Sequence, residues 1–183
     1  MTTQQDDKIL FIITGGTIDS QADGYDGISI FEDGQKSIVP EYINSKFPDK
    51  DCEFTTVCMK DSGEITNDDK IKGDIIKLIE NTDANRFIIT HGTDTMADTA
   101  SFIKENINNK DATIVMVGAM TPLRAEDTDG YKNLDFAVEK VQEIDSGVHI
   151  AMHRQVFEAG NVRKDFEKKK FVELAEKQDR SIG

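Results

Sequence analysis

Short apolar runs recur along this chain and alternate with segments in which apolar residues return every three or four positions. The apolar runs are rich in isoleucine and valine, and two of them lead directly into loops that contain glycine. Runs of this kind are typical of strands that are buried on both faces of a sheet. The pattern predicts strands over 8–14, 53–59, 86–90, 112–117 and 148–152.

Amphipathic helices are predicted between these strands. One helix starts at the capping sequence Thr66–Asp69, and the isoleucines that follow recur at helical spacing. Ser37 is a candidate cap for a short helix that runs to Phe47. Two more helices are predicted over 97–106 and 131–144, and no structure is assigned to the mostly polar tail over 164–183.

This alternation of strand and helix predicts an α/β fold. We expect a three-layer, mostly parallel, flavodoxin-like sheet with helices on both faces and right-handed crossovers. No repeat or linker divides the 183 residues, which we interpret as a single domain over 1–183.

Two loops rich in glycine and hydroxyl groups follow the first and third predicted strands. They are Thr14–Ile18, with the sequence TGGTI, and His91–Thr95, with the sequence HGTDT. In an open parallel sheet, ligands bind just beyond the carboxyl ends of the strands. We therefore expect the loops to bring Thr17, Thr93 and Asp94 to one crevice.

The glycine pair of the first loop is by itself better explained as a tight turn that needs two small residues. It lacks the third glycine of a dinucleotide fingerprint, and no Lys-Ser or Lys-Thr pair follows as in a phosphate-binding loop. The pair gains interest because a second threonine and a carboxylate are predicted at the same edge of the sheet.

The segment from Asp19 to Gln35 has no clear period and is expected to act as a lid over that crevice. Its aspartates do not have the alternating spacing and final glutamate of a calcium loop. His149 and His153 have no cysteine or carboxylate at ligand spacing, so we predict no metal site.

Charge and composition exclude some partners. The chain has 35 acidic and 22 basic residues, a net charge of −13, which argues against nucleic acid and anionic membranes because phosphate is bound by Lys and Arg. The polar segment Met1–Lys8 indicates no signal peptide, and no apolar run approaches transmembrane length. Cys52 and Cys58 on one strand would lie ~20 Å apart and could not pair with each other. We expect a reduced, cytoplasmic setting.

Together, the two loops resemble the two signatures of the bacterial-type L-asparaginase family. Further segments match that family in the same order, and the combination is much more specific than either loop alone. These segments are Lys60–Thr66, Val117–Pro122, Asp129–Leu134 and Val156–Lys164.

The resemblance implies hydrolysis of L-asparagine to L-aspartate and ammonia through an acyl-threonine intermediate, with room for weak glutaminase activity and with neither metal nor cofactor. Thr17 would be the nucleophile, assisted by Tyr25 of the lid. Thr93, Asp94 and Lys164 would form a second catalytic group.

The same resemblance implies a set of substrate-binding residues. Ser62 would bind the substrate's α-carboxylate and Asp94 its α-ammonium group. The backbone amides of Thr17 and Ala119 would stabilise the oxyanion. The implied substrate-binding set is Gly16, Asp61, Ser62, Gly92, Thr93, Asp94 and Ala119.

Typical family members are nearly twice as long, and their smaller C-terminal domain contributes an acidic residue to a neighbouring subunit. The 183-residue chain ends at Gly183, so the resemblance implies a short member without that domain, and we expect a homodimer or larger homo-oligomer. Two alternatives stay open. One is a non-catalytic module that senses aspartate or asparagine, and the other is the amidase part of a tRNA-dependent amidotransferase, which the acidic composition disfavours.

Overall fold

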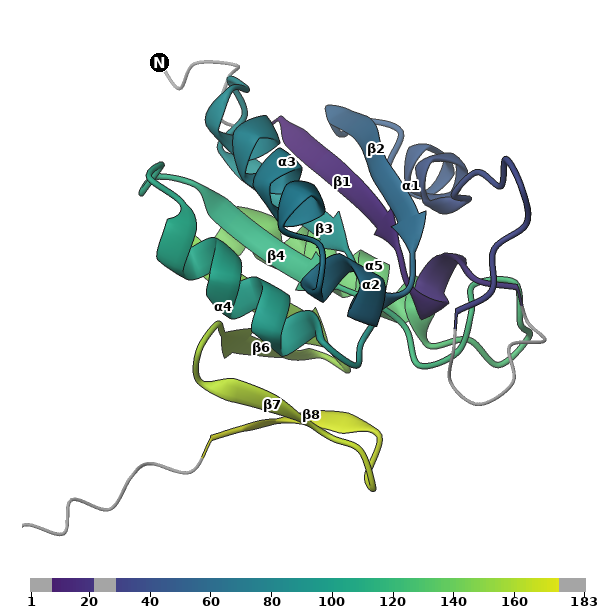
Figure 1. Cartoon of the computed structure of the whole chain (residues 1–183). Helices are drawn as coiled ribbons and strands as arrows, with labels where there is room; N and C mark the ends of the chain where they lie inside the picture. Colours follow the sequence, from purple (N-terminus) through teal and green to yellow (C-terminus); the bar gives the residue numbers. More distant parts are fainter. Residues whose placement is uncertain (1–7, 22–28, 175–183) are drawn as a thin grey trace, which may run out of the picture.

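The computed structural model describes residues 8–21 and 29–174, which form a six-stranded sheet with helices packed on both faces (Figure 1). The strand order is β2-β1-β3-β4-β5-β6. The first five strands are parallel, and β6 pairs antiparallel with β5. The order 2-1-3-4-5 is that of a flavodoxin-like sheet, so the predicted α/β class and the mostly parallel sheet are confirmed.

The elements have the following bounds. The strands are β1 (Ile9–Gly15), β2 (Cys52–Lys60), β3 (Arg86–Thr90), β4 (Thr113–Val117), β5 (Gly147–Met152), β6 (Gln155–Glu158), β7 (Val162–Asp165) and β8 (Lys170–Glu173). The helices are the 3₁₀ turn η2 (Thr17–Asp19) and the α-helices α1 (Val39–Lys46), α2 (Ser62–Thr66), α3 (Asp69–Glu80), α4 (Met96–Asn106) and α5 (Gly130–Glu143).

Strand β1 is apolar almost throughout because it contributes to two cores. Leu10 and Ile12 pack with α3 and α4 on one face of the sheet. Ile9, Phe11 and Ile13 pack with α1 and α5 on the other face. All residues of β1 are buried, as predicted for a strand covered on both sides, and Figure 1 shows α3 and α4 on the face opposite α5.

The structure corrects one predicted helix start and agrees with another. Helix α1 has Ile38 as its N-cap, although Ser37 Oγ accepts a hydrogen bond from Val39 N at 3.1 Å. Helix α3 has Asp68 as its N-cap, and the Asp68 carboxylate accepts hydrogen bonds from two amides of the first turn. This N-cap lies within the predicted capping sequence Thr66–Asp69, and its carboxylate satisfies free amides of the first turn.

Several short elements were missed from the sequence. Helix α2 spans five residues, too few to show a helical period. Strands β6, β7 and β8 have four residues each and carry several polar side chains. They contain too few apolar residues for an alternating pattern to stand out. The last of them lies in the tail to which no structure was assigned.

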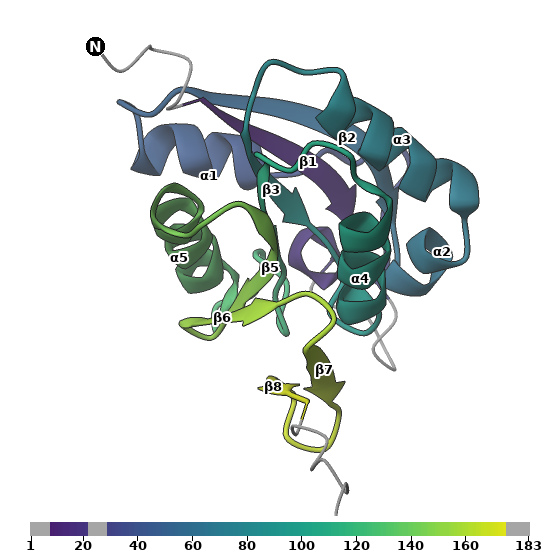
Figure 2. The same cartoon turned by 90° about the vertical axis from the view of Figure 1, so that its left-hand side faces the viewer.

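Strands β7 and β8 form a separate antiparallel hairpin beyond the sheet edge at β6 (Figure 2). Val162 and Phe171 of this hairpin are buried in the core that α3 and α4 cover. The Phe171 ring also lies 6.3 Å from the ring of Phe157 in β6. Since Phe171 is the register partner of Lys164, this apolar anchor also fixes the strand that carries Lys164.

Candidate active site

The two predicted loops meet at the point where the strand order reverses, between β1 and β3, which is where flavodoxin-like folds bind ligands. Gly16 has a φ of 80°, and a Cβ at this position would overlap the backbone nitrogen and Cα of Gly92. A Cβ on Gly92 would in turn lie 2.7 Å from Cβ of Ser62. Glycine at both positions therefore brings the first loop, the second loop and the start of α2 into close contact.

Lys164 reaches the second loop from the hairpin. Its Nζ donates hydrogen bonds to Thr93 Oγ1 at 2.7 Å and to Asp94 Oδ1 at 2.5 Å. The Lys164 side chain is 10% exposed, whereas the Asp94 side chain is 51% exposed. The three residues predicted to form one group thus lie together, with a mostly covered lysine at a buried hydroxyl and a carboxylate open to solvent.

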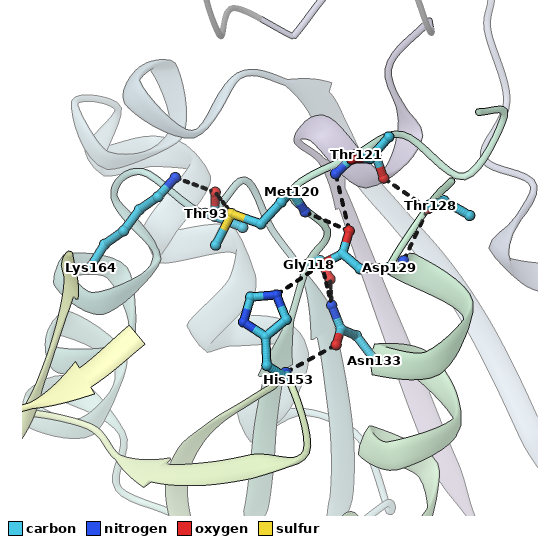
Figure 3. Close-up of polar contacts among 10 residues, drawn as sticks. Thr93, Gly118, Met120, Thr121, Thr128, Asp129, Asn133, His153 and Lys164 are labelled. Carbon is cyan, nitrogen blue, oxygen red and sulfur yellow. Dashed lines mark hydrogen bonds and ion pairs between the residues drawn. The ribbon is translucent and has the colours of Figure 1, made fainter. Parts of the chain in front are cut away.

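The Thr93 hydroxyl has a second partner. Thr93 Oγ1 donates to Met120 Sδ at 3.6 Å, so the hydroxyl accepts from the lysine and directs its own proton toward the sulfur (Figure 3). Methionine is common in apolar cores, so the residue type alone does not mark Met120 as part of the site. Only the fold shows that its sulfur faces the site.

His91 supports the second loop from inside the protein. The residue is fully buried, and its Nδ1–H donates to the carbonyl of Gly92 at 2.8 Å. Burial lowers the pKa of His91 to about 4, so the imidazole is neutral near pH 7. These features are those of a structural member of the loop.

Asp61 acts as the N-cap of α2. Its carboxylate accepts hydrogen bonds from Gly63 N at 3.0 Å and from Ser29 N at 3.2 Å. The Glu64 side chain accepts from the Asp61 amide at 3.2 Å, which completes a capping box. The Asp61 side chain therefore holds α2 to the segment that begins at Ser29.

Ser62, the first residue of α2, is 2% exposed and packs against Gly92. Its carbonyl accepts a hydrogen bond from Thr95 Oγ1 at 2.8 Å, and Thr66 Oγ1 donates to Thr95 Oγ1 at 2.7 Å. These threonine contacts fix α2 against the second loop and hold Ser62 next to Gly92.

Thr17 begins η2, one residue after the contact between Gly16 and Gly92. Thr17 is half-buried, and its carbonyl accepts hydrogen bonds from Ser20 N at 3.1 Å and from Ser20 Oγ at 3.0 Å. The tight turn places Thr17 at the carboxyl end of β1, beside the second loop. Tyr25, the predicted lid tyrosine, lies outside the described residues.

Asp19 ends the same turn with a buried carboxylate. The residue has no exposed surface, and within the described part of the chain neither carboxylate oxygen has a hydrogen-bond partner. Burial raises the pKa of Asp19 to about 6, although Ser37 and Arg124 act in the opposite direction. The carboxylate lies two residues from Thr17 and was not predicted to be buried.

The turn over 118–121, which contains Ala119, forms the third side of the site. A Cβ on Gly118 would lie 2.5 Å from the carbonyl oxygen of His91 and 3.2 Å from Cγ2 of Thr93. The turn therefore packs directly on the second loop. Ala119 itself is buried.

Asp129 holds this turn from behind. Its Oδ1 accepts hydrogen bonds from Met120 N at 2.9 Å and Thr121 N at 3.0 Å, and its Oδ2 accepts from Asn133 Nδ2 at 2.9 Å (Figure 3). The Oδ2 atom also faces His153 Nε2 at 3.1 Å. The sequence pointed to Asp129 and Asn133 only through the family resemblance, and it considered His153 only as a metal ligand, because His153 reaches Asp129 from a separate strand end.

The described residues offer no evident metal site. Within residues 8–21 and 29–174, no group of three or more His, Cys, Asp or Glu side chains could hold a metal ion. In these same ranges, no helix is long and apolar enough to cross a membrane. Cys52 and Cys58 lie on the same strand, β2, as predicted, and both are free thiols.

The fold and the site together define a doubly wound α/β domain that collects two threonines, an aspartate and a lysine at its switch point. The chain belongs to the asparaginase family, since the family model described as "Asparaginase, N-terminal" matches residues 8–171.

Relatives and solved structures place the chain in the same family. It is 34% identical over 134 residues to L-asparaginase 1 of Escherichia coli (strain K12), covering 71% of this chain and 39% of that protein. It is 38% identical over 90 residues to the glutaminase-asparaginase of Acinetobacter glutaminasificans, covering 48% of this chain and 27% of that protein. The crystal structure of a probable cytoplasmic L-asparaginase from Campylobacter jejuni matches with a TM-score of 0.69 and 30% identity, over 87% of this chain and 50% of that one. The chain thus spans half or less of the length of these relatives.

Proposed function

We propose that this chain hydrolyses L-asparagine to L-aspartate and ammonia. The observation that carries the proposal is the position of Lys164 Nζ, 2.7 Å from Thr93 Oγ1 and 2.5 Å from Asp94 Oδ1, beside the loop that bears Thr17. A hydroxyl, an amine and a carboxylate in hydrogen-bond contact at a ligand-binding edge are the groups that acyl transfer from an amide requires. The names of the matched relatives agree with this chemistry.

In the first chemical step, Thr17 Oγ attacks the side-chain amide carbon of the substrate. A C–O bond forms, and the carbonyl π electrons move to the oxygen. When the carbonyl reforms, the C–N bond breaks, and the nitrogen leaves as ammonia with the proton that the hydroxyl gave up. Water then attacks the acyl ester, which releases L-aspartate and restores the Thr17 hydroxyl. Tyr25 is proposed to assist the attack by Thr17.

Thr93, Lys164 and Asp94 serve as the second catalytic group and move protons in this scheme. The Thr93 hydroxyl already accepts a hydrogen bond from Lys164, and Lys164 donates a second one to Asp94. Lys164 can take a proton from Thr93 only when it releases one of its own to the Asp94 carboxylate and the Thr93 hydrogen turns from Met120 Sδ toward Nζ. The burial of Thr93 and Lys164 keeps bulk water from competing for this transfer.

Amino-acid recognition uses charge and backbone amides. The half-exposed Asp94 carboxylate is proposed to bind the α-ammonium group of the substrate. Ser62, placed by the Asp61 cap, and the amides next to Gly16 and Gly92 are proposed to bind the α-carboxylate. Glutamine is longer by one methylene, a difference that pockets discriminate only about 10- to 200-fold, so we propose weak glutaminase activity.

The amides of Thr17 and Ala119 are proposed to stabilise the oxyanion. Ala119 belongs to the turn that packs on the second loop, and Thr17 follows the contact between Gly16 and Gly92. Donors held rigidly before the reaction stabilise developing charge with little reorganisation, which is the property an oxyanion site needs.

The test is ammonia release from L-asparagine and L-glutamine by the wild type and Thr17→Ala, with Thr55→Ala on β2 as an exposed control. We expect asparagine turnover that Thr17→Ala lowers by orders of magnitude and Thr55→Ala leaves unchanged. A mass increase of the intact wild type under rapid quench, absent in Thr17→Ala, would identify the acyl-enzyme. Aspartate binding without any turnover would reject the enzyme and favour a sensor module.

A further inference from the structure

We infer that His153 is a positioning residue for the turn over 118–121 and that it acts through Asp129. The inference rests on the proposed function, in which the Ala119 amide of this turn stabilises the oxyanion. His153 lies at the far end of the contact chain that begins at Lys164 and passes through Thr93 and Met120 (Figure 3).

The contacts of Asp129 show how His153 can affect the site. One carboxylate oxygen accepts from the amides of Met120 and Thr121, which directly follow Ala119. The other oxygen accepts from Asn133 and from His153 Nε2–H at 3.1 Å. The orientation of one planar carboxylate therefore sets the direction of two peptide groups, and His153 restrains the outer side of that carboxylate.

His153 lies in a turn with an unusual backbone conformation. His153 and Arg154 link β5 to β6 in a two-residue turn, with φ values of 51° and 60°. A hairpin turn with positive φ at both central residues favours Asn-Gly, because larger side chains are strained there. Both residues share this conformation, so the turn by itself does not distinguish His153 from Arg154.

The two turn residues differ in what their side chains contact. The Arg154 guanidinium lies 5.8 Å from the centre of the ring of Phe136, a buried residue of α5, in a cation–π contact. The His153 side chain instead contacts Asp129, and its backbone N–H donates to Asn133 Oδ1 at 3.0 Å. His153 thus has a contact that leads to the active site, whereas Arg154 does not.

His153 is also the member of this network that can be changed with the least damage to the fold. Its side chain is 34% exposed, whereas Asn133 is 2% exposed and also donates to the carbonyl of Gly118 at 3.0 Å. Loss of the His153 side chain leaves Asp129 bound to Asn133 and to both amides. We therefore expect a looser turn in a folded protein, which should affect transition-state stabilisation more than substrate binding.

Three variants distinguish the effect of the His153 side chain on Asp129 from the effect of the backbone turn between β5 and β6. His153→Asn keeps a residue that tolerates positive φ but is too short to reach Asp129. His153→Gln restores a long side chain with an N–H donor. Arg154→Gly removes the conformational strain from the same β5–β6 turn and leaves the contacts of Asp129 unchanged, so it is the matched control.

We expect His153→Asn to remain as stable as the wild type and to lower kcat about fivefold, the factor that one net hydrogen bond represents, with KM within about twofold. His153→Gln should recover most of kcat, and Arg154→Gly should leave kcat unchanged. An unchanged kcat in His153→Asn, or a loss that only follows a smaller folded fraction, would overturn the inference.

A second readout does not need activity. Amide hydrogen exchange at Met120 and Thr121, measured by NMR on the ligand-free protein, should be faster in His153→Asn than in the wild type and in Arg154→Gly. Equal exchange rates would show that His153 does not hold the turn and would reject the inference. If the wild type releases no ammonia, the proposed function fails, whereas the exchange comparison still decides whether His153 positions the turn.

Discussion

At the residue scale, burial keeps two ionisable side chains near the threonine loops in their neutral forms over part of the pH range. His91 is fully buried, and its pKa is lowered to about 4. Asp19 has no exposed surface, and its pKa is raised to about 6. The two pKa shifts change the stability of the fold with pH in opposite directions. The folded state binds fewer protons at His91 than the unfolded state does, and it binds more protons at Asp19.

The Asp19 carboxylate should therefore destabilise the fold near neutral pH. Between about pH 4 and 6 the folded state holds a proton on Asp19 that the unfolded state has lost, so this contribution falls as pH rises. The difference between an ordinary pKa of 3.8 and about 6 corresponds to about 3 kcal/mol at pH 7. Asp19→Asn should raise the free energy of unfolding at pH 7 by up to that amount, as measured by urea denaturation.

The shape of the pH profile gives a sharper check of the same prediction. His91 contributes stability that is present above about pH 6.5 and is lost as pH falls toward 4, so in the wild type it offsets Asp19. Asp19→Asn removes the opposing effect of Asp19. The free energy of unfolding of this variant should therefore increase from pH 4 to 6.5. The exposed Asp33 provides the control variant Asp33→Asn. If the free energy of unfolding depends on pH in the same way in Asp19→Asn and in Asp33→Asn, the raised pKa of Asp19 is contradicted.

Thr93→Val tests the lysine contact directly. Valine has nearly the same shape but removes the oxygen that accepts from Lys164 and donates to Met120. We expect asparagine turnover to fall by orders of magnitude, as for the loss of a member of a catalytic unit, while the fold is kept. Steady-state kinetics and circular dichroism measure the two properties, with Thr55→Val as the exposed control. Near-normal turnover would remove Thr93 from the proposed mechanism.

At the element scale, the strands that carry the two loops were predictable because they are buried on both faces. Ile9–Ile13 and Phe87–Ile89 are apolar without interruption, and each run leads into a loop with its own glycine signature. Helix α3 was predictable from its isoleucine spacing. The sequence did not predict the hairpin that delivers Lys164, because β7 and β8 depend on single buried anchors, Val162 and Phe171, and show no repeating pattern.

The contact between the two loops depends on the absence of a side chain at Gly16. Gly16→Ala would place a Cβ against the Gly92 backbone in a conformation with a φ of 80°. Gly160 has a similar φ of 86°, but a Cβ there meets no atom within 4 Å. We expect Gly160→Ala to cost about 1–2 kcal/mol from conformation alone and Gly16→Ala to cost clearly more and to abolish turnover. Equal thermal shifts for the two variants would show that the loops are not in tight contact.

At the scale of the whole molecule, the surface beside the site is partly apolar and the chain is strongly acidic. Phe166 is 63% exposed, and its ring centre lies 5.2 Å from Lys164 Nζ. A single exposed phenylalanine is common on protein surfaces, but this one contacts the lysine of the site, which in turn contacts the half-exposed Asp94. Whatever covers Phe166 would also help to exclude water from the reaction.

We predict that a second copy of this chain covers Phe166, giving a homodimer. Because each chain carries a net charge of −13, the copies repel one another, and added salt should strengthen the dimer by screening that repulsion. Phe166→Ser should shift the protein toward monomer and raise KM for asparagine, whereas Phe166→Leu should keep the dimer. Sedimentation at micromolar concentration, at low and moderate salt, with parallel kinetics, measures both effects. A protein that stays monomeric at every salt concentration, with the same KM in Phe166→Ser, would show that one copy completes the site unaided.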